Sequence, residues 1–129
     1  MPWPSPFRGR WRHGLATDPD GCWVAEDAEG IAGVSVGLRR GAVWGLSLLA
    51  VRVGVQSRGI GRALLEHALR TAEGTDAGLI VSSDDPRAIR RYALAGFALR
   101  PTLSSTDTPD LDALPAHTGT AWATRPTSI

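Results

Sequence analysis

Short runs of apolar, β-favouring residues separated by turn residues dominate the first half of the chain. Residues 22–25 and 31–36 form two such runs, and the segment 27–30 between them ends in Gly, so the pattern predicts a hairpin. A second tight connection at 39–41 leads into a long apolar run over 42–53. Because this run is too apolar for a strand at the edge of a sheet, we expect it at the buried centre.

The second half of the chain alternates between helical and extended patterns. Apolar residues recur every three or four positions over 60–72, which predicts an amphipathic helix stopped by Gly74. We expect a buried strand at 78–81, a helix over 87–95 and an extended run at 97–100. This order predicts an α/β (α+β) fold, with a mixed, mostly antiparallel sheet and helices on both faces.

The two ends of the chain depart from this pattern. Residues 1–20 contain three Pro within the first six positions, and we expect a loosely ordered arm with at most one helical turn near 11–16. Residues 21–129 are expected to form a single domain. Within it, the Ser, Thr, Asp and Pro residues of 104–115 predict a loop, and 118–124 is a candidate last strand.

Composition narrows the class of protein. The chain has 129 residues, 43% of them hydrophobic, which suffices for the core of one domain. Its formal charge of +1 attracts neither nucleic acid nor a membrane surface, so we expect neither as a partner. No apolar run approaches the ~20 residues of a membrane span, and a signal peptide is lacking, so we expect a cytoplasmic protein. All 14 basic residues are Arg, which excludes Schiff-base chemistry and a Walker-type Lys.

Several residues that suggest other chemistries are better explained as structural. The three His residues lack metal-ligand spacing, so we expect no metal. Cys22 cannot form an intrachain disulfide and is interpreted as a small buried residue. Residues 33–37 match the Gly-x-Ser-x-Gly nucleophile elbow, but no helical pattern follows, so we interpret Ser35 as a strand residue.

The most informative segment joins the long apolar run to the helix that follows. A Gly-bearing turn at 56–61 opens onto the first turn of that helix, where N–H groups lack partners and the dipole is positive. Gly59 and Gly61 remove the Cβ atoms that would hold an anion away. Arg58 and Arg62 add positive charge beside them. The pattern predicts a phosphate or pyrophosphate site, the alternative being a tight turn that uses Gly only for backbone freedom.

The segment Gln56-x-x-Gly59-x-Gly61 resembles the acyl-CoA-binding segment of the GNAT superfamily of N-acetyltransferases. The resemblance continues at 85–97, which is similar to the family's second motif, an Asn-x-x-Ala helix that ends in Tyr-x-x-x-Gly-Phe. The match covers roughly residues 21–100. It implies a GNAT-like sheet with a central β-α-β unit that binds acetyl-CoA.

The resemblance also implies roles for single residues. The strand through Leu49 and Val51 would pair with the pantetheine arm, and the Val51 amide would polarise the thioester carbonyl. Tyr92 would protonate the leaving thiolate, the alternative being an aromatic that only seals the helix against the sheet. The candidates for binding acetyl-CoA are Leu49, Val51, Val53, Gln56, Ser57, Arg58, Gly59, Ile60, Gly61, Arg62, Asp85, Ala88 and Tyr92.

A base or a chain of water molecules must accept the proton of the attacking amine, which is protonated at neutral pH. Glu26 and Asp27, at the end of the first predicted strand, and Ser47 on the central one are the candidates. With Tyr92 and Val51, Glu26 completes the predicted catalytic set.

The sequence departs from the family pattern in a few places. Asp85 stands where the family usually has Asn, Val53 replaces a common Pro and Ser57 a common Gly. The family also places a strand and two helices before the first hairpin, where this chain has about twenty residues. We therefore expect an open sheet edge at Cys22, with apolar faces left uncovered, and a homodimer that buries them.

Together these observations predict an acetyl-CoA-dependent N-acetyltransferase that transfers its acetyl group directly to an amine of a small molecule or peptide. The alternative is a shortened GNAT-like domain that binds CoA or a partner protein without catalysis.

Overall fold

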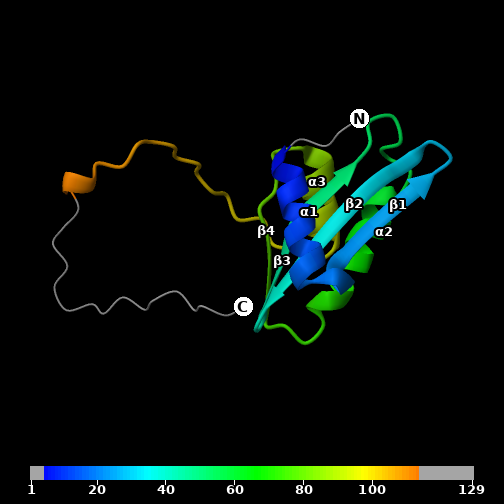
Figure 1. Ribbon diagram of the computed structural model, residues 1–129, viewed down its shortest axis with the longest axis horizontal. Coiled ribbons are helices and arrows are strands. Elements are labelled where there is room, and N and C mark those ends of the chain that lie inside the picture. Colours follow the sequence, from blue (N-terminus) through cyan, green and yellow to red (C-terminus); the bar gives the residue numbers. More distant parts are fainter. Residues whose placement is uncertain (1–4, 114–129) are drawn as a thin grey trace. The chain divides into compact units, whose positions relative to one another are not determined.

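The computed structural model describes residues 5–113, and the chain divides into two units, Met1–Leu99 and Arg100–Ile129. No helix among the described residues is long and apolar enough to cross a membrane. The second unit contains one short 3-10 turn, Leu111–Ala113, within its described part. The first unit (Figure 1) contains helices α1 (Ser5–Thr17), α2 (Ile60–Leu69) and α3 (Pro86–Leu94), strands β1 (Cys22–Asp27), β2 (Gly30–Arg40), β3 (Val43–Val51) and β4 (Ala77–Ile80), and 3-10 turns at Pro19–Gly21 and Arg70–Ala72.

The four strands form one sheet in the order β1-β2-β3-β4. β1 pairs with β2, and β2 with β3, in antiparallel hairpins, whereas α2 crosses over to bring β4 parallel to β3. The predicted hairpins and the mixed, mostly antiparallel sheet are therefore confirmed. The long apolar run forms β3 in the interior of the sheet, as its composition predicted.

Helix α1 covers one face of the sheet (Figure 1). Val34 and Val36 of β2 and Leu48 of β3 form the buried cluster on this face, and Phe7 and Trp11 of α1 pack against it. The two aromatic residues stand one helical turn apart, so they lie on the same side of α1.

Helices α2 and α3 pack on the opposite face, which confirms the expected helices on both faces. The buried cluster there contains Trp44 of β3 with Leu65 and Ala68 of α2. Tyr92 of α3 packs against this cluster, together with Phe97, whose ring lies 6.3 Å from that of Trp44 between centroids.

Small residues of β2 make room for α2 on this second face. Ser35 is fully buried, and its hydroxyl donates to the carbonyl of Leu64 at 3.1 Å. A Cβ on Gly33 would lie 2.8 Å from the Leu64 side chain, and one on Gly37 would lie 3.1 Å from the carbonyl of Ala68. The Gly-x-Ser-x-Gly segment is thus a packing surface inside a strand, as predicted for Ser35.

The expectation of a loosely ordered N-terminal arm is wrong, because residues 5–17 form helix α1. Pro6 lies in its first turn, where a backbone N–H has no intrahelical partner to lose, so the ring is tolerated. Gly14 allows a close approach to the sheet, since a Cβ there would lie 2.6 Å from Val36. Apolar packing on the sheet stabilises a helix that the early prolines alone would not favour.

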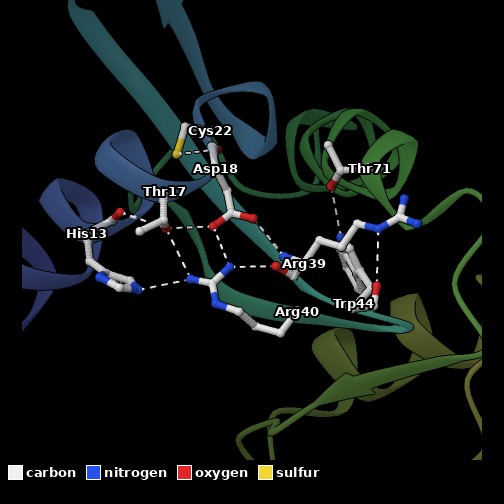
Figure 2. Close-up of polar contacts among 9 residues, drawn as sticks. His13, Thr17, Asp18, Cys22, Arg39, Arg40, Trp44 and Thr71 are labelled. Atoms are coloured by element: carbon white, nitrogen blue, oxygen red, sulfur yellow. Dashed lines mark hydrogen bonds and ion pairs between the residues drawn. The ribbon is translucent and has the colours of Figure 1, made fainter. Parts of the chain in front are cut away.

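Polar contacts fix the end of α1 against the end of β2 (Figure 2). The Asp18 carboxylate accepts hydrogen bonds from the Arg39 amide and the Arg40 guanidinium, both at 2.8 Å, and from the Thr17 hydroxyl. Arg40 also contacts the His13 ring at 3.2 Å. Burial alone would raise the pKa of Asp18, but these hydrogen bonds outweigh it and lower the pKa.

Two further expectations fail in the second half of the chain. Residues 97–100 form no strand; instead the amide of Phe97 donates to the Tyr92 carbonyl and its ring enters the core. The strand predicted at 78–81 exists as β4 but is not buried. It is an edge of the described sheet, with Leu79 63% exposed.

The C-terminal expectations are only partly tested. The described part of the 104–115 loop contains no helix or strand beyond the turn at Leu111–Ala113, which agrees with the prediction. The candidate strand at 118–124 lies outside the described residues.

Candidate active site

The two parallel strands separate at their carboxyl ends, and a cavity lies there. β3 and β4 pair only from Val43 to Leu46, opposite Ala77 to Ile80. Helix α2 begins after the first strand and α3 after the second, so both helix N-termini face this cavity. Its volume is about 470 Å³, and β3, the loop before α2, the segment after β4, α3 and α1 all contribute to its lining.

β3 presents free backbone groups to the cavity. The amide of Arg52 donates to the Ala32 carbonyl of β2 at 2.8 Å. Because successive residues of a strand direct these groups to opposite sides, the amides of Leu49 and Val51 lie on the other side, toward β4. Pairing with β4 has ended by this point, so these amides have no ladder partner among residues 5–113. The Val51 carbonyl accepts a hydrogen bond from Gln56 Nε2 at 3.3 Å.

The first turn of α2 presents a second set of free amides. Gly59 is the N-cap with φ of +81°, a conformation that glycine adopts without strain, and no side chain caps the helix. The amides of residues 59–62 find no acceptor within the described part of the chain. Ser57 also has a positive φ, +67°, and lines the cavity. These amides, at the positive end of the helix, are suited to an anion.

Arginines from α3 approach the same turn. A Cβ placed on Gly61 would lie 2.7 Å from the Arg91 guanidinium carbon, so the absence of a side chain at Gly61 lets Arg91 approach α2. Arg62 lines the cavity and pairs with Glu66 at 2.9 Å in an exposed position. The positive charge expected beside the turn therefore comes from two helices, not one.

Asp85 links α3 to the loop that precedes α2. Its carboxylate caps α3 by accepting from the Arg87 amide at 2.9 Å, and it also binds the Arg87 guanidinium at 3.0 Å. Arg87 Nη1 in turn donates to Gln56 Oε1 at 3.0 Å. The side-chain hydrogen bond from Arg87 lowers the pKa of Asp85, so the carboxylate is ionised and can only accept hydrogen bonds. It cannot donate as an Asn amide would.

Tyr92 lines the cavity from α3 while its ring packs against the core. Burial raises the pKa of the phenol, although the nearby Arg91 opposes this shift. The hydroxyl is therefore protonated at neutral pH. It has no hydrogen-bond partner among residues 5–113, which leaves it able to donate to a bound molecule.

The structure brings most of the predicted site residues together. Those that line the cavity are Leu49, Val51, Gln56, Ser57, Gly59, Gly61, Arg62, Asp85, Ala88 and Tyr92. Four predicted residues lie outside this lining: Val53, Arg58, Ile60 and Glu26. The roles of all of them stay predictions.

Sequence reasoning missed several residues that line the cavity. Arg87 and Arg91 were part of the second motif but received no role, although they repeat every four residues beside Ala88 and Tyr92 and so share a side of α3. Arg10 of α1 donates to the Ser47 carbonyl at 3.3 Å. No sequence signal pointed to Arg10, because its segment was expected to be loosely ordered.

No group of three or more potential metal ligands gathers among residues 5–113. Cys22, the lone thiol of the sequence, is half-buried with its Sγ 3.5 Å from the Asp18 carbonyl, and burial raises its pKa. A thiol so protonated is a poor nucleophile.

Known proteins resemble this chain in sequence pattern and in fold. The model of the acetyltransferase (GNAT) family matches residues 1–97. No curated protein matches the sequence. Among solved structures, PH1933 from Pyrococcus horikoshii OT3 is similar at 23% identity, with a TM-score of 0.65, over 75% of this chain and 68% of that one.

Two further structures are similar in fold. The ribosomal-protein-S18-alanine N-acetyltransferase from Escherichia coli is 22% identical, with a TM-score of 0.58, over 78% of this chain and 64% of its own. Naa20 from Chaetomium thermophilum, in complex with a bisubstrate analogue, is 23% identical, with a TM-score of 0.60, over 74% of this chain and 58% of its own. Likeness at these identities shows the fold, and the chain spans about two thirds or less of the length of all three.

Proposed function

The chain belongs to the GNAT family of acetyltransferases, and on that premise we propose that it is an acetyl-CoA-dependent N-acetyltransferase. It would transfer the acetyl group directly to an amine of a small molecule or peptide. One observation carries this proposal: Gly59, Gly61 and Arg62, whose amides are free, line the same cavity as Leu49 and Val51, whose strand amides are free. An anionic diphosphate and an extended amide-bearing arm need these two features side by side.

Different residues of the cavity would bind acetyl-CoA and catalyse the transfer. The amides of residues 59–62, with Arg62 and Arg91 beside them, would hold the diphosphate of acetyl-CoA. The free edge of β3 would hydrogen-bond the pantetheine arm. The Val51 amide would stabilise the negative charge that develops on the thioester oxygen during attack. The Tyr92 hydroxyl, which stays protonated at neutral pH because burial raises its pKa, would protonate the departing thiolate.

The proton of the attacking amine needs a separate acceptor. Of the three candidates, only Ser47 lines the cavity. Asp27 is paired with Arg52 at 2.6 Å, and a hydrogen bond from the Glu29 amide lowers its pKa, which makes it a weak base. We therefore propose that the proton leaves through water molecules that pass Ser47. The role of Glu26 stays a prediction, and Glu26→Gln tests it: a fall in kcat of about 10²-fold would make Glu26 the base.

Tyr92→Phe is the test of the proposed chemistry. The variant keeps the packed ring and removes the hydroxyl, so kcat should fall roughly 10²-fold while the KM for acetyl-CoA changes little. Release of free thiol from acetyl-CoA in the presence of an amine panel measures both. Turnover at the wild-type rate would show that Tyr92 is only a packing residue.

A second candidate function is a domain that binds CoA or a partner protein without catalysis. One observation favours it: among residues 5–113, Asp85 is the only carboxylate or imidazole in the cavity lining, and it is already paired with Arg87. Calorimetry and thiol release together separate the two functions. Binding of acetyl-CoA with no thiol release for any amine would support the binding domain.

We still propose a homodimer, but for a different reason. Its argument from an uncovered sheet face fails, because α1 covers that face. The outer edge of β1, beginning at Cys22, still lacks a strand partner among residues 5–113. Light scattering at micromolar concentration tests the proposal, and a particle of 13.7 kDa would contradict it.

A further inference from the structure

A second cavity, of about 330 Å³, lies on the α1 face of the sheet. We call it the apolar cavity, because apolar side chains from α1 and the three antiparallel strands make almost all of its lining. These are Phe7, Trp11, Val24, Ile31, Val34 and Leu48. Val24 and Ile31 are each more than 40% exposed, so the cavity opens to solvent near the first hairpin.

The apolar cavity adjoins the candidate active site. Phe7 and Leu48 line both cavities. Leu48 immediately precedes Leu49, whose free amide faces the active site, so one short stretch of β3 serves both. A side group attached to an amine in the active site would therefore have the apolar cavity next to it.

The chemistry of the lining limits what this substituent can be. No carboxylate lines the apolar cavity among the described residues, and its charged lining residue is Arg8. Arg10 stands two positions after Arg8 on α1 and lines the adjoining active site. Among the described residues a second ammonium group would find no carboxylate in this lining, whereas an aromatic or branched aliphatic group would bury apolar surface.

We propose that the acceptor is an amine whose neighbouring carbon atoms carry one aromatic or branched aliphatic group, and that this group enters the apolar cavity. This inference rests on the proposed N-acetyltransferase function. The same chemistry occurs in free arylalkylamines and at the N-terminus of a peptide that begins with a large apolar residue. The volume of about 330 Å³ is at the lower end of the range for small-molecule sites.

The experiment compares amines in the thiol-release assay at saturating acetyl-CoA. The probes are 2-phenylethylamine, a tripeptide with N-terminal Phe, ethanolamine and putrescine. We expect kcat/KM to be about tenfold or more higher for the two aromatic amines than for ethanolamine or putrescine. A preference between 2-phenylethylamine and the tripeptide then identifies which source of the shared chemistry the site accepts.

A pair of variants links this preference to the cavity. Ile31→Asp places a carboxylate in the lining, and Val43→Asp makes the same change outside it; the two residues are similarly exposed, at 45% and 48%. Ile31→Asp should lower kcat/KM for 2-phenylethylamine about tenfold and narrow its advantage over putrescine, with acetyl-CoA affinity unchanged. Val43→Asp should leave the amine preference unchanged. Ile31→Thr, a milder change, gives the same readout if Ile31→Asp fails to fold.

The outcomes separate this inference from the proposed function. Turnover that prefers ethanolamine or putrescine, or an aromatic preference that survives both Ile31 variants, would overturn the inference and leave the N-acetyltransferase standing. Binding of acetyl-CoA without turnover of any amine would overturn the proposed function and this inference with it. An aromatic preference lost only in the Ile31 variants would support both.

Discussion

Two glycine-bearing segments of this chain look alike in sequence and do different work. Residues 33–37 lie inside β2, where their small side chains face α2 and the Ser35 hydroxyl bonds to that helix. Residues 56–61 run from the loop after β3 into the first turn of α2, where backbone amides face an open cavity. Both segments use glycine for close approach, but the backbone of α2 packs against the first, whereas the second is approached by the Arg91 side chain and leaves its amides without partners among residues 5–113. Free amides, and not glycine itself, therefore mark the site.

The largest expected effect comes from adding one methyl group to residues 33–37, the segment that packs against α2. In Gly37→Ala the new Cβ would lie 2.9 Å from the Trp44 indole nitrogen and 3.1 Å from the Ala68 carbonyl, so β2 and α2 must separate. We expect the free energy of unfolding to fall by about 2 kcal/mol, as urea denaturation would measure. Gly9→Ala on α1 is the control, since nothing lies within 4 Å of its Cβ; it should be neutral or stabilising. Equal effects of the two changes would refute the packing role.

Gly61→Asp tests whether residues 56–61 bind acetyl-CoA. The new carboxylate would lie among the free amides of α2 and against the Arg91 guanidinium, which is flexible enough to move, so the fold should survive. We expect acetyl-CoA affinity to fall at least about tenfold, or about 1.4 kcal/mol, in calorimetry.

Gly61→Asn is the matched control for this change, because it adds the same bulk without the charge. It should lose less affinity than Gly61→Asp. If both variants bind acetyl-CoA like the wild type, the turn is not part of the site.

Ser35→Ala sharpens the distinction between packing and chemistry. It removes one buried hydrogen bond, to a Leu64 carbonyl that is also part of the α2 helix, so unfolding should become easier by about 1 kcal/mol. Thiol release should stay at the wild-type rate. A loss of activity of about 10³-fold with the fold intact would make Ser35 a nucleophile after all.

The smallest expected effect is at Ser57, whose φ of +67° is unfavourable for a residue with a Cβ. Ser57→Gly removes this strain but also gives the unfolded chain more freedom, so stability should rise by less than about 1 kcal/mol. Thermal unfolding measures the change. A clear destabilisation would mean that the Ser57 side chain holds the turn in place.

The sequence by itself determined the elements whose signals are local. Alternation and turn residues located the two hairpins, and three- and four-residue spacing located α2. The acidic residues beside Pro86 and the stop at Gly96 located α3 within a few positions. The strand, glycine turn and helix around residues 56–61 located the free amides at the start of α2, because N–H groups at a helix start have no intrahelical partners. The Asp85 cap of α3 is equally local.

Only the tertiary structure decided the features that depend on distant partners. Helix α1 is stabilised by Phe7 and Trp11 against β2 and β3, a contact that no local pattern in a proline-rich segment reveals. Residues 97–100 have strand-like composition but form no strand, since a strand exists only where another one pairs with it. The approach of Arg91 to Gly61 and the apolar cavity beside the site likewise join segments far apart in the sequence. Local rules fix which elements form, but the free energy of docking and pairing fixes which surfaces meet.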